Sequence, residues 1–283
     1  MEIRKVGVVG CGQMGGGIAQ VCAQSGYAVL VSEANNELLQ KGLTAIKSSL
    51  DRSVQREKIT QQDRDAALGR IRGTINVREF GDRDLVIEAA LENLELKKKI
   101  FGEMDKVCPR HTILATNTSC LSVLDIAAAT KRPDKVMGMH FFNPAPTMKL
   151  LEIVRTTATS EETLDMGKAF GRSLGKTIVM IQDSPGFIVN RLMTPQILSA
   201  IRMVEAGIAT KEDIDTGMTL GLNYPMGPLA LADLIGLDTL LFIANGIYEK
   251  LREAQYAPPP LLKNMVADGR LGRKTGRGFY EYK

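Results

Sequence analysis

Short apolar runs alternate with longer amphipathic stretches along the chain up to about residue 183. Several of these runs are almost unbroken Val, Ile and Leu, which is typical of strands that helices cover on both faces. Strands that alternate with helices predict an α/β fold built on a mainly parallel sheet. We predict eight strands, at residues 5–10, 28–33, 74–77, 85–90, 112–117, 135–141, 150–155 and 176–183.

The segment between the second and third predicted strands is too long for one crossover helix. Residues 36–71 are charged and periodic, with a break around residues 58–61, and they predict an inserted helical hairpin. The chain is predicted to divide into a sheet domain, residues 1–184, and an all-helical domain, residues 185–283. The helices predicted in the second domain are residues 187–206, 211–220, 229–251 and 260–267.

The composition fits a folded, water-soluble protein of 283 residues, because 44% of the residues are hydrophobic and 24% are charged. No uncharged apolar run reaches the ~18 residues of a membrane span, and the first residues lead directly into a strand, so we expect no signal peptide. The four cysteines show neither a CxxC pair nor metal-ligand spacing, which favours reduced thiols, no metal and a cytoplasmic location. The net charge of +4 is too modest and too dispersed to indicate nucleic-acid binding, and it suits an anionic small substrate.

A glycine-rich turn follows the first predicted strand. Its sequence, Gly10-Cys11-Gly12-Gln13-Met14-Gly15, fits the pattern G-x-G-x-x-G and leads into a helix. The first glycine of such a turn permits a tight bend, the second admits a pyrophosphate, and the third lets the helix approach the strand. The helix N-terminus then faces the phosphates. The sequence therefore predicts a Rossmann-like domain that binds a dinucleotide.

The residue that contacts the adenosine ribose is expected at the end of the second strand. That strand ends in Ser32 and Glu33. A carboxylate at Glu33 accepts a hydrogen bond from a ribose 2′-hydroxyl and repels a 2′-phosphate, whereas Ser32 is able to donate to that phosphate. No arginine follows directly, so the sequence favours NAD and leaves NADP open.

Only two histidines, His111 and His140, are available as an imidazole proton carrier. His111 lies in a turn, where a solvated position is expected. His140 ends a predicted strand, and ligands bind at the ends of parallel strands. Glu152 follows twelve residues later in an apolar run, and a carboxylate beside an imidazole fixes its tautomer and stabilises the imidazolium. Spacing alone leaves a core His–Glu pair equally open.

Two polar clusters lie near the same predicted edge of the sheet and at the start of the second domain. The first runs from Asn117 to Cys120, and the second contains Asn190 and Arg191. Helix caps and hinge residues explain such clusters equally well. A nucleophilic Cys120 is rejected, because no second histidine is placed to activate it.

These residues together resemble the short-chain 3-hydroxyacyl-CoA dehydrogenase family, and the bacterial 3-hydroxybutyryl-CoA dehydrogenases in particular, over the full length. The glycine motif is common to many folds, but the runs that follow it are specific. They are His140-Phe141-Phe142-Asn143-Pro144, Pro185-Gly186-Phe187-Ile188-Val189-Asn190-Arg191 and Pro225-Met226-Gly227-Pro228.

The resemblance implies reversible hydride transfer between a nicotinamide and C3 of a short-chain 3-hydroxyacyl-CoA. It implies that His140 is the general acid/base, that Glu152 polarises it, and that Ser119 and Asn190 hydrogen-bond the substrate oxygens. The positions implied to contact the dinucleotide, besides the turn residues Gly10, Gly12, Gln13, Met14 and Gly15, are Ser32, Glu33, Glu92, Lys97, Ser119, Asn143 and Lys274. Coenzyme A is implied to contact Ser49, Arg56 and Ser119, with Arg52 as a plausible neighbour; without the resemblance, the charged insertion reads as a solvated helical face.

The chain departs from the family pattern at Ser32, where Asp is usual, and this leaves the cofactor choice open. The resemblance also implies a homodimer formed through the helical domain. Three alternatives remain: an NADPH-preferring acetoacetyl-CoA reductase, a dehydrogenase of non-CoA hydroxy acids such as sugar acids, and a non-catalytic dinucleotide sensor. The sensor is ranked last, because it gives no reason for His140, Glu152, Ser119 and Asn190 to occur together.

Overall fold

A computed structural model describes residues 2–282 and divides the chain into two compact units. The first unit extends to Asp183 and the second begins at Ser184. The predicted boundary, after residue 184, lies one residue beyond the boundary between these two units. Each unit is described by itself.

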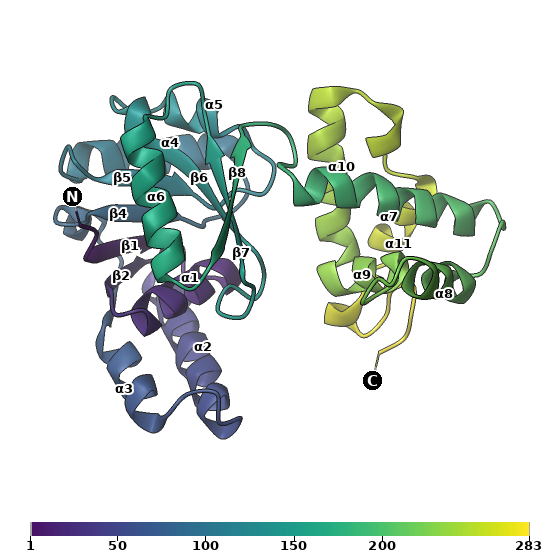
Figure 1. The fold of residues 1–283 in the computed structure, drawn as a ribbon, viewed down its shortest axis with the longest axis horizontal. Coiled ribbons are helices and arrows are strands. Elements are labelled where there is room, and N and C mark those ends of the chain that lie inside the picture. The colour runs from purple at the N-terminus through teal and green to yellow at the C-terminus, as the bar shows by residue number, and fades with distance from the viewer. Residues whose placement is uncertain (1, 283) are drawn as a thin grey trace. The chain divides into compact units, whose positions relative to one another are not determined.

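The first unit is built on one eight-stranded sheet with the order β3-β2-β1-β4-β5-β6-β7-β8 (Figure 1). Every neighbouring pair is parallel except β6 and β7, which are antiparallel. The strands are β1 Lys5–Val9, β2 Ala28–Ser32, β3 Ile71–Thr74, β4 Leu85–Glu88, β5 Ile113–Thr116, β6 Val136–Phe141, β7 Leu150–Arg155 and β8 Thr177–Gln182. The Rossmann-like, mainly parallel sheet is therefore confirmed, and the strand order reverses between β1 and β4.

Helices cover both faces of this sheet (Figure 1). Side chains of α1 and α6 belong to one core cluster on one face, while α4 and α5 pack together against the other. The helices of the first unit are α1 Gln13–Gln24, α2 Asn36–Gln55, α3 Gln61–Gly69, α4 Leu94–Val107, α5 Val123–Ala127 and α6 Glu161–Ser173.

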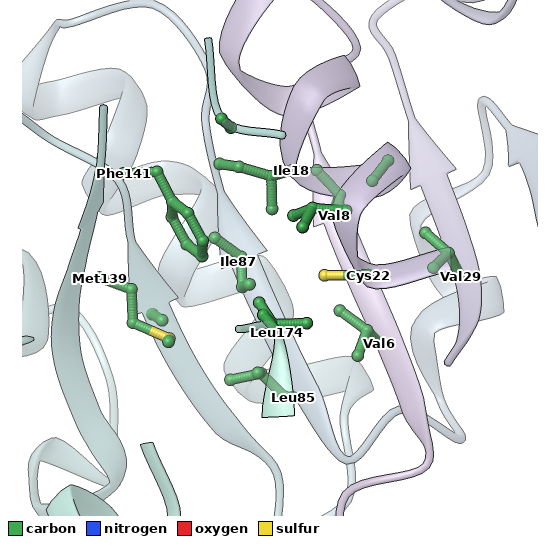
Figure 2. Close-up of a cluster of buried hydrophobic side chains, with 14 of the residues drawn as sticks. Val6, Val8, Ile18, Cys22, Val29, Leu85, Ile87, Met139, Phe141 and Leu174 are labelled. Atoms are coloured by element: carbon green, nitrogen blue, oxygen red, sulfur yellow. The ribbon is translucent and has the colours of Figure 1, made fainter. Parts of the chain in front are cut away.

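The core on the α1 and α6 face is made by alternate residues of the strands. Figure 2 shows Val6 and Val8 of β1 beside Leu85 and Ile87 of β4, with Phe141 of β6 further along the sheet. All five side chains are at most 2% exposed. Burial of each such side chain contributes about 1.5–3 kcal/mol. This packing fixes the strands relative to one another, and so it holds their carboxyl ends in one row.

The inserted helical hairpin is formed by α2 and α3. Its break follows from local chemistry, because Thr60 caps α3 and forms a reciprocal capping box with Asp63. The Asp63 carboxylate accepts from the Thr60 backbone N–H and hydroxyl, and these hydrogen bonds hold its pKa below the usual value.

One predicted strand was wrong in position. The third strand was expected at residues 74–77, but β3 spans Ile71–Thr74, and residues 77–80 form a 3₁₀ helix. The Asn76 side chain accepts from the Arg78 N–H and so caps that helix. The strand itself, Ile-Arg-Gly-Thr, lacks an apolar run, and only its pairing with β2 defines it.

The second unit is all-helical, with α7 Val189–Glu205, α8 Lys211–Gly221, α9 Pro228–Ile235, α10 Leu237–Leu251 and α11 Pro260–Ala267. The single helix predicted at residues 229–251 was wrong. It is divided at Gly236, whose φ of +98° no helix residue adopts, and the axes of α9 and α10 meet at 97°. Among the described residues no single helix is long and apolar enough to cross a membrane, although the bent α9–α10 pair reaches the required length and composition jointly.

Two of the three glycines of the glycine motif, Gly12 and Gly15, differ in what they can tolerate. A Cβ at Gly15 would collide with the carbonyl oxygen of Gly10, whereas a Cβ at Gly12 would meet nothing within 4 Å. We expect Gly15→Ala to lower the melting temperature by several degrees, since overpacking typically costs about 1–3 kcal/mol. Gly12→Ala is the matched control, and its melting temperature should equal that of the wild type. Equal melting of both variants would refute the close approach of α1 to the turn.

Candidate active site

The β1–α1 turn lies at the carboxyl edge of the sheet, where the strand order reverses. Gly10 adopts a φ of +97°, and its N–H donates to the Ser32 carbonyl at 2.8 Å, so the turn is tied to β2. Helix α1 begins at Gln13 and continues through Met14, and the preceding Gly12 provides no side chain to cap it. Its first N–H groups therefore suit a bound anion, as the dinucleotide prediction requires.

Glu33 connects the end of β2 to this turn. Its carboxylate accepts from the Cys11 N–H at 2.7 Å and from the Ala34 N–H at 3.0 Å. Ser32, the alternative ribose-binding residue, is only 7% exposed. Burial raises the pKa of the neighbouring Cys11 thiol to about 11, so this thiol stays protonated near neutral pH.

His140 and Glu152 meet across the antiparallel pair β6–β7. The register pairs the two residues directly, and His140 Nδ1 lies 2.6 Å from Glu152 Oε2. Glu152 is fully buried and His140 is 6% exposed, with the Phe142 ring 4.5 Å from the imidazole centroid. A proton on Nδ1 donated to Glu152 leaves Nε2 as the nitrogen that exchanges protons with a ligand. The other histidine, His111, is exposed, as expected.

Ser119 is held at the carboxyl end of β5 by Glu92, which follows β4. Glu92 Oε1 accepts from the Ser119 N–H at 2.7 Å, and it lies 3.3 Å from the Ser119 hydroxyl. The Thr118 hydroxyl donates to the same oxygen at 2.5 Å. The carboxylate thus fixes the turn that contains Ser119.

A buried lysine joins Glu92 to a second carboxylate. Lys97 of α4 is 1% exposed, and its Nζ lies 2.6 Å from Glu88 Oε1 and 3.1 Å from Glu92 Oε2. Glu88, the last residue of β4, is also 1% exposed and accepts from the Thr116 hydroxyl at 2.7 Å. One cation is therefore shared by two carboxylates, and each charged group has hydrogen-bonding partners.

The remaining candidates lie outside this cluster. Asn143 is exposed in the loop after β6. Ser49 and Arg52 lie in the second half of α2, and Arg56 ends that helix. Ser49 is half-buried, and both arginines are exposed. Two candidates belong to the second unit. Asn190 is 7% exposed in the first turn of α7, and Lys274 forms an ion pair with Asp238.

Sequence reasoning missed Glu88 and Thr116 as members of this site, and it placed Asn117 in a polar cluster at the sheet edge without giving it a contact. Glu88 does have a signal, because it is the one charged residue in the apolar strand Leu-Val-Ile-Glu. A charge that ends a buried strand needs a partner, and Lys97 supplies it. The contacts of Thr116 and Asn117 depend on which strands are neighbours, and the sequence does not show that order.

The fold and the cluster at the strand ends define a dinucleotide-dependent oxidoreductase. Comparison with known proteins names the family: residues 5–184 match the 3-hydroxyacyl-CoA dehydrogenase, NAD binding domain, and residues 186–282 match the C-terminal domain. The chain belongs to the 3-hydroxyacyl-CoA dehydrogenase family. The match to its NAD binding domain supports NAD as the cofactor.

Similar proteins match over the whole length. The chain is 49% identical to a 3-hydroxybutyryl-CoA dehydrogenase of Mycobacterium tuberculosis over 282 residues, which cover 99% of each chain. It is 47% identical to a probable 3-hydroxybutyryl-CoA dehydrogenase of Bacillus subtilis, over 100% of this chain and 98% of the relative. A crystal structure of the (S)-3-hydroxybutyryl-CoA dehydrogenase PaaH1 from Ralstonia eutropha is 46% identical, with a TM-score of 0.94 over 100% of both chains.

The charge balance around Lys97 generates a stability prediction. Lys97→Met leaves the buried Glu88 and the half-buried Glu92 without their cation, and loss of one partner from a buried pair such as Lys97–Glu88 costs about 3–5 kcal/mol. The neighbouring Lys98 provides the control, because it pairs with Glu95 at the surface, where the Glu95 side chain is 81% exposed. We expect Lys98→Met to change the free energy of unfolding by no more than about 0.5 kcal/mol. Urea denaturation of both variants measures the difference, and equal losses would contradict the buried Lys97–Glu88 pair.

Proposed function

We propose that this protein is an NAD-dependent (3S)-3-hydroxyacyl-CoA dehydrogenase that interconverts 3-hydroxybutyryl-CoA and acetoacetyl-CoA. The observation that carries the proposal is the buried His140–Glu152 pair, 2.6 Å apart, at the same sheet edge as the glycine turn. The full-length similarity to 3-hydroxybutyryl-CoA dehydrogenases supports the substrate class.

His140 acts as the general acid/base at the oxygen on C3. In the oxidative direction neutral His140 takes the hydroxyl proton at Nε2, and in the reductive direction the imidazolium returns it to the carbonyl oxygen. Glu152 accepts from Nδ1 throughout, and so it holds the ring orientation and balances the positive charge that forms. When bound, NAD accepts the hydride from C3 or, as NADH, donates it.

Ser119 and Asn190 contact the substrate oxygens. The Glu92 carboxylate fixes the Ser119 backbone, and this orients the hydroxyl at the end of β5. Asn190 provides an amide from the first turn of α7. Groups held this way reduce the entropy lost when the substrate reaches its reactive position.

The residues of the turn fit a dinucleotide. The uncapped start of α1 and the open space around Gly12 suit a pyrophosphate. Glu33 contacts the ribose hydroxyls in place of the Asp that the family usually has at Ser32. Its fixed carboxylate disfavours the 2′-phosphate of NADP. Further contacts come from Gly10, Gln13, Met14, Gly15, Glu92, Lys97, Ser119, Asn143 and Lys274.

Coenzyme A binds along the second half of α2. Arg56 ends this helix, and Arg52 lies about one turn before it. Both guanidinium groups are exposed and suit the phosphates of coenzyme A. Ser49 lies a further turn back on the same helix and completes this contact, with Ser119 at the thioester end.

The protein works as a cytoplasmic homodimer in this proposal. The second unit exposes large apolar side chains that a partner subunit would cover, and the four cysteines are buried thiols, which suits a reducing compartment. Light scattering distinguishes a dimer from a single 30.9 kDa chain. The most exposed of these side chains are Leu192, Ile208, Leu220, Leu222, Leu234 and Phe242.

The reaction itself is tested by mixing the purified protein with acetoacetyl-CoA and following the loss of reduced-cofactor absorbance. We expect turnover with NADH and at least about tenfold lower kcat/KM with NADPH, because a 2′-phosphate beside Glu33 costs more than about 1.4 kcal/mol. Absence of turnover with either cofactor would refute the acyl-CoA assignment. Preference for NADPH would keep the reaction and reject Glu33 as the ribose contact.

Substitution of the two histidines separates chemistry from binding. We expect His140→Gln to lower kcat by about 10²–10⁴-fold, the usual contribution of a general acid/base, with NADH affinity largely unchanged. His111→Gln, at the exposed histidine, is the control and should retain full activity. Loss of NADH binding in His140→Gln would make His140 a structural residue instead.

Arg56 tests the coenzyme A contact. Arg56→Ala should raise the KM for acetoacetyl-CoA by about fivefold with little change in kcat, because it removes a charged contact remote from the reacting carbon. Lys41→Ala is the matched control, since Lys41 is an exposed cation near the other end of α2. Equal KM values for the Arg56 variant and the wild type would remove Arg56 from the site.

A further inference from the structure

Strand β6 extends past the end of its neighbour β5. The register between these two parallel strands ends where Thr116 lies beside Gly138. His140 lies two residues further along β6, beyond the last backbone pair on this side. On the other side the pairing with β7 continues through Phe141 and Leu151. The strand segment that carries His140 is therefore held to β5 by something other than the ladder.

A side chain takes the place of the missing ladder bond. Asn117 Oδ1 accepts from the Phe141 N–H at 2.9 Å. The Asn117 backbone is itself fixed, because its N–H donates to the Glu88 carbonyl at 2.7 Å. Phe141 is 2% exposed, so its N–H has little access to solvent and needs this acceptor. Asn117 thus connects the ends of β4, β5 and β6.

Asn117 also begins the turn that presents Ser119. Only Thr118 lies between them in sequence, and the Ser119 N–H is fixed separately by Glu92 at 2.7 Å. One end of the Asn117 contact therefore lies on the turn of Ser119 and the other on the residue after His140.

We propose that Asn117 is a positioning residue that sets the spacing between His140 and Ser119. It acts through the Phe141 backbone and needs no contact with the substrate. This inference rests on the proposed function, in which His140 and Ser119 act on neighbouring substrate oxygens. Spacing of this kind matters because a displacement of about 1 Å in reacting groups can lower a rate by about 100-fold.

The required group is a hydrogen-bond acceptor at the end of a short side chain. Asn117→Ala removes it, and Asn117→Asp retains an oxygen at the same reach. We expect the alanine variant to lose about 10–100-fold in kcat, with KM for acetoacetyl-CoA within about threefold and NADH affinity within about twofold of wild type. We expect the aspartate variant, measured at its own optimum pH, to recover kcat to within about threefold. If Asn117 served folding alone, Asn117→Ala would lower the stability of the protein but would not lower kcat selectively while KM stays nearly unchanged.

Two outcomes would overturn the proposal. The first is an alanine variant with wild-type kcat, and the second is an aspartate variant as impaired as the alanine variant. If Asn117→Ala does not fold, Asn117→Ser replaces it in the experiment. The serine side chain is one bond shorter than that of asparagine, so its hydroxyl does not reach the Phe141 N–H.

Hydrogen–deuterium exchange separates this inference from the proposed function. Exchange at residues 138–142 does not depend on turnover, and we expect it to be faster in Asn117→Ala than in the wild type. Unchanged exchange would overturn the contact even in an active enzyme. If the wild type does not turn over acetoacetyl-CoA but exchange is still faster in Asn117→Ala, the proposed reaction is refuted. The contact between Asn117 and the Phe141 N–H is then retained.

Discussion

The antiparallel pairing of β6 with β7 is the constraint on which the site depends. In a parallel sheet every strand ends at the same edge, so a side chain early in a strand lies far from the ligand. Because β7 runs the other way, its beginning reaches that edge, and Glu152 comes to lie directly opposite His140. A slip of one residue in this register would turn Glu152 to the opposite face of the sheet and leave the imidazole without its carboxylate. The buried core on either side of this pair opposes such a slip.

The other parts of the site extend from that pair through neighbouring strand ends. The buried Glu88 and Lys97 and the half-buried Glu92 form a group of charges that fixes the turn of Ser119, and Asn117 connects this turn to β6. The glycine turn lies at the next strand end, where the order of strands reverses. His140 and Glu152 therefore depend on backbone positions that the sheet determines, and the turn of Ser119 is fixed by a side chain at the neighbouring strand end.

Much of the sheet could be predicted, because most of its strands are short apolar runs that favour a buried strand over any other structure. The position predicted for the third strand was wrong, because Ile-Arg-Gly-Thr has no such pattern and is defined only by its pairing with β2. The helix expected at residues 229–251 failed at Gly236, because a single glycine inside an apolar helical pattern does not reveal its φ. In the site, His140 and Glu152 could be proposed as a pair from spacing and strand ends. The contacts of Asn117 and Thr116 could not, because they join strands whose adjacency is known only from the fold.

In the proposed mechanism Glu152 holds His140 in the tautomer that leaves Nε2 to carry the proton. This is measured directly by ¹⁵N NMR of the imidazole nitrogens, because the protein has only two histidines and His111→Asn leaves a single one. We expect neutral His140 to bear its proton on Nδ1, beside Glu152, and Nε2 to be unprotonated. In Glu152→Gln the preference for this tautomer should weaken. A neutral His140 protonated on Nε2 in the otherwise unmodified site would contradict the proposed mechanism.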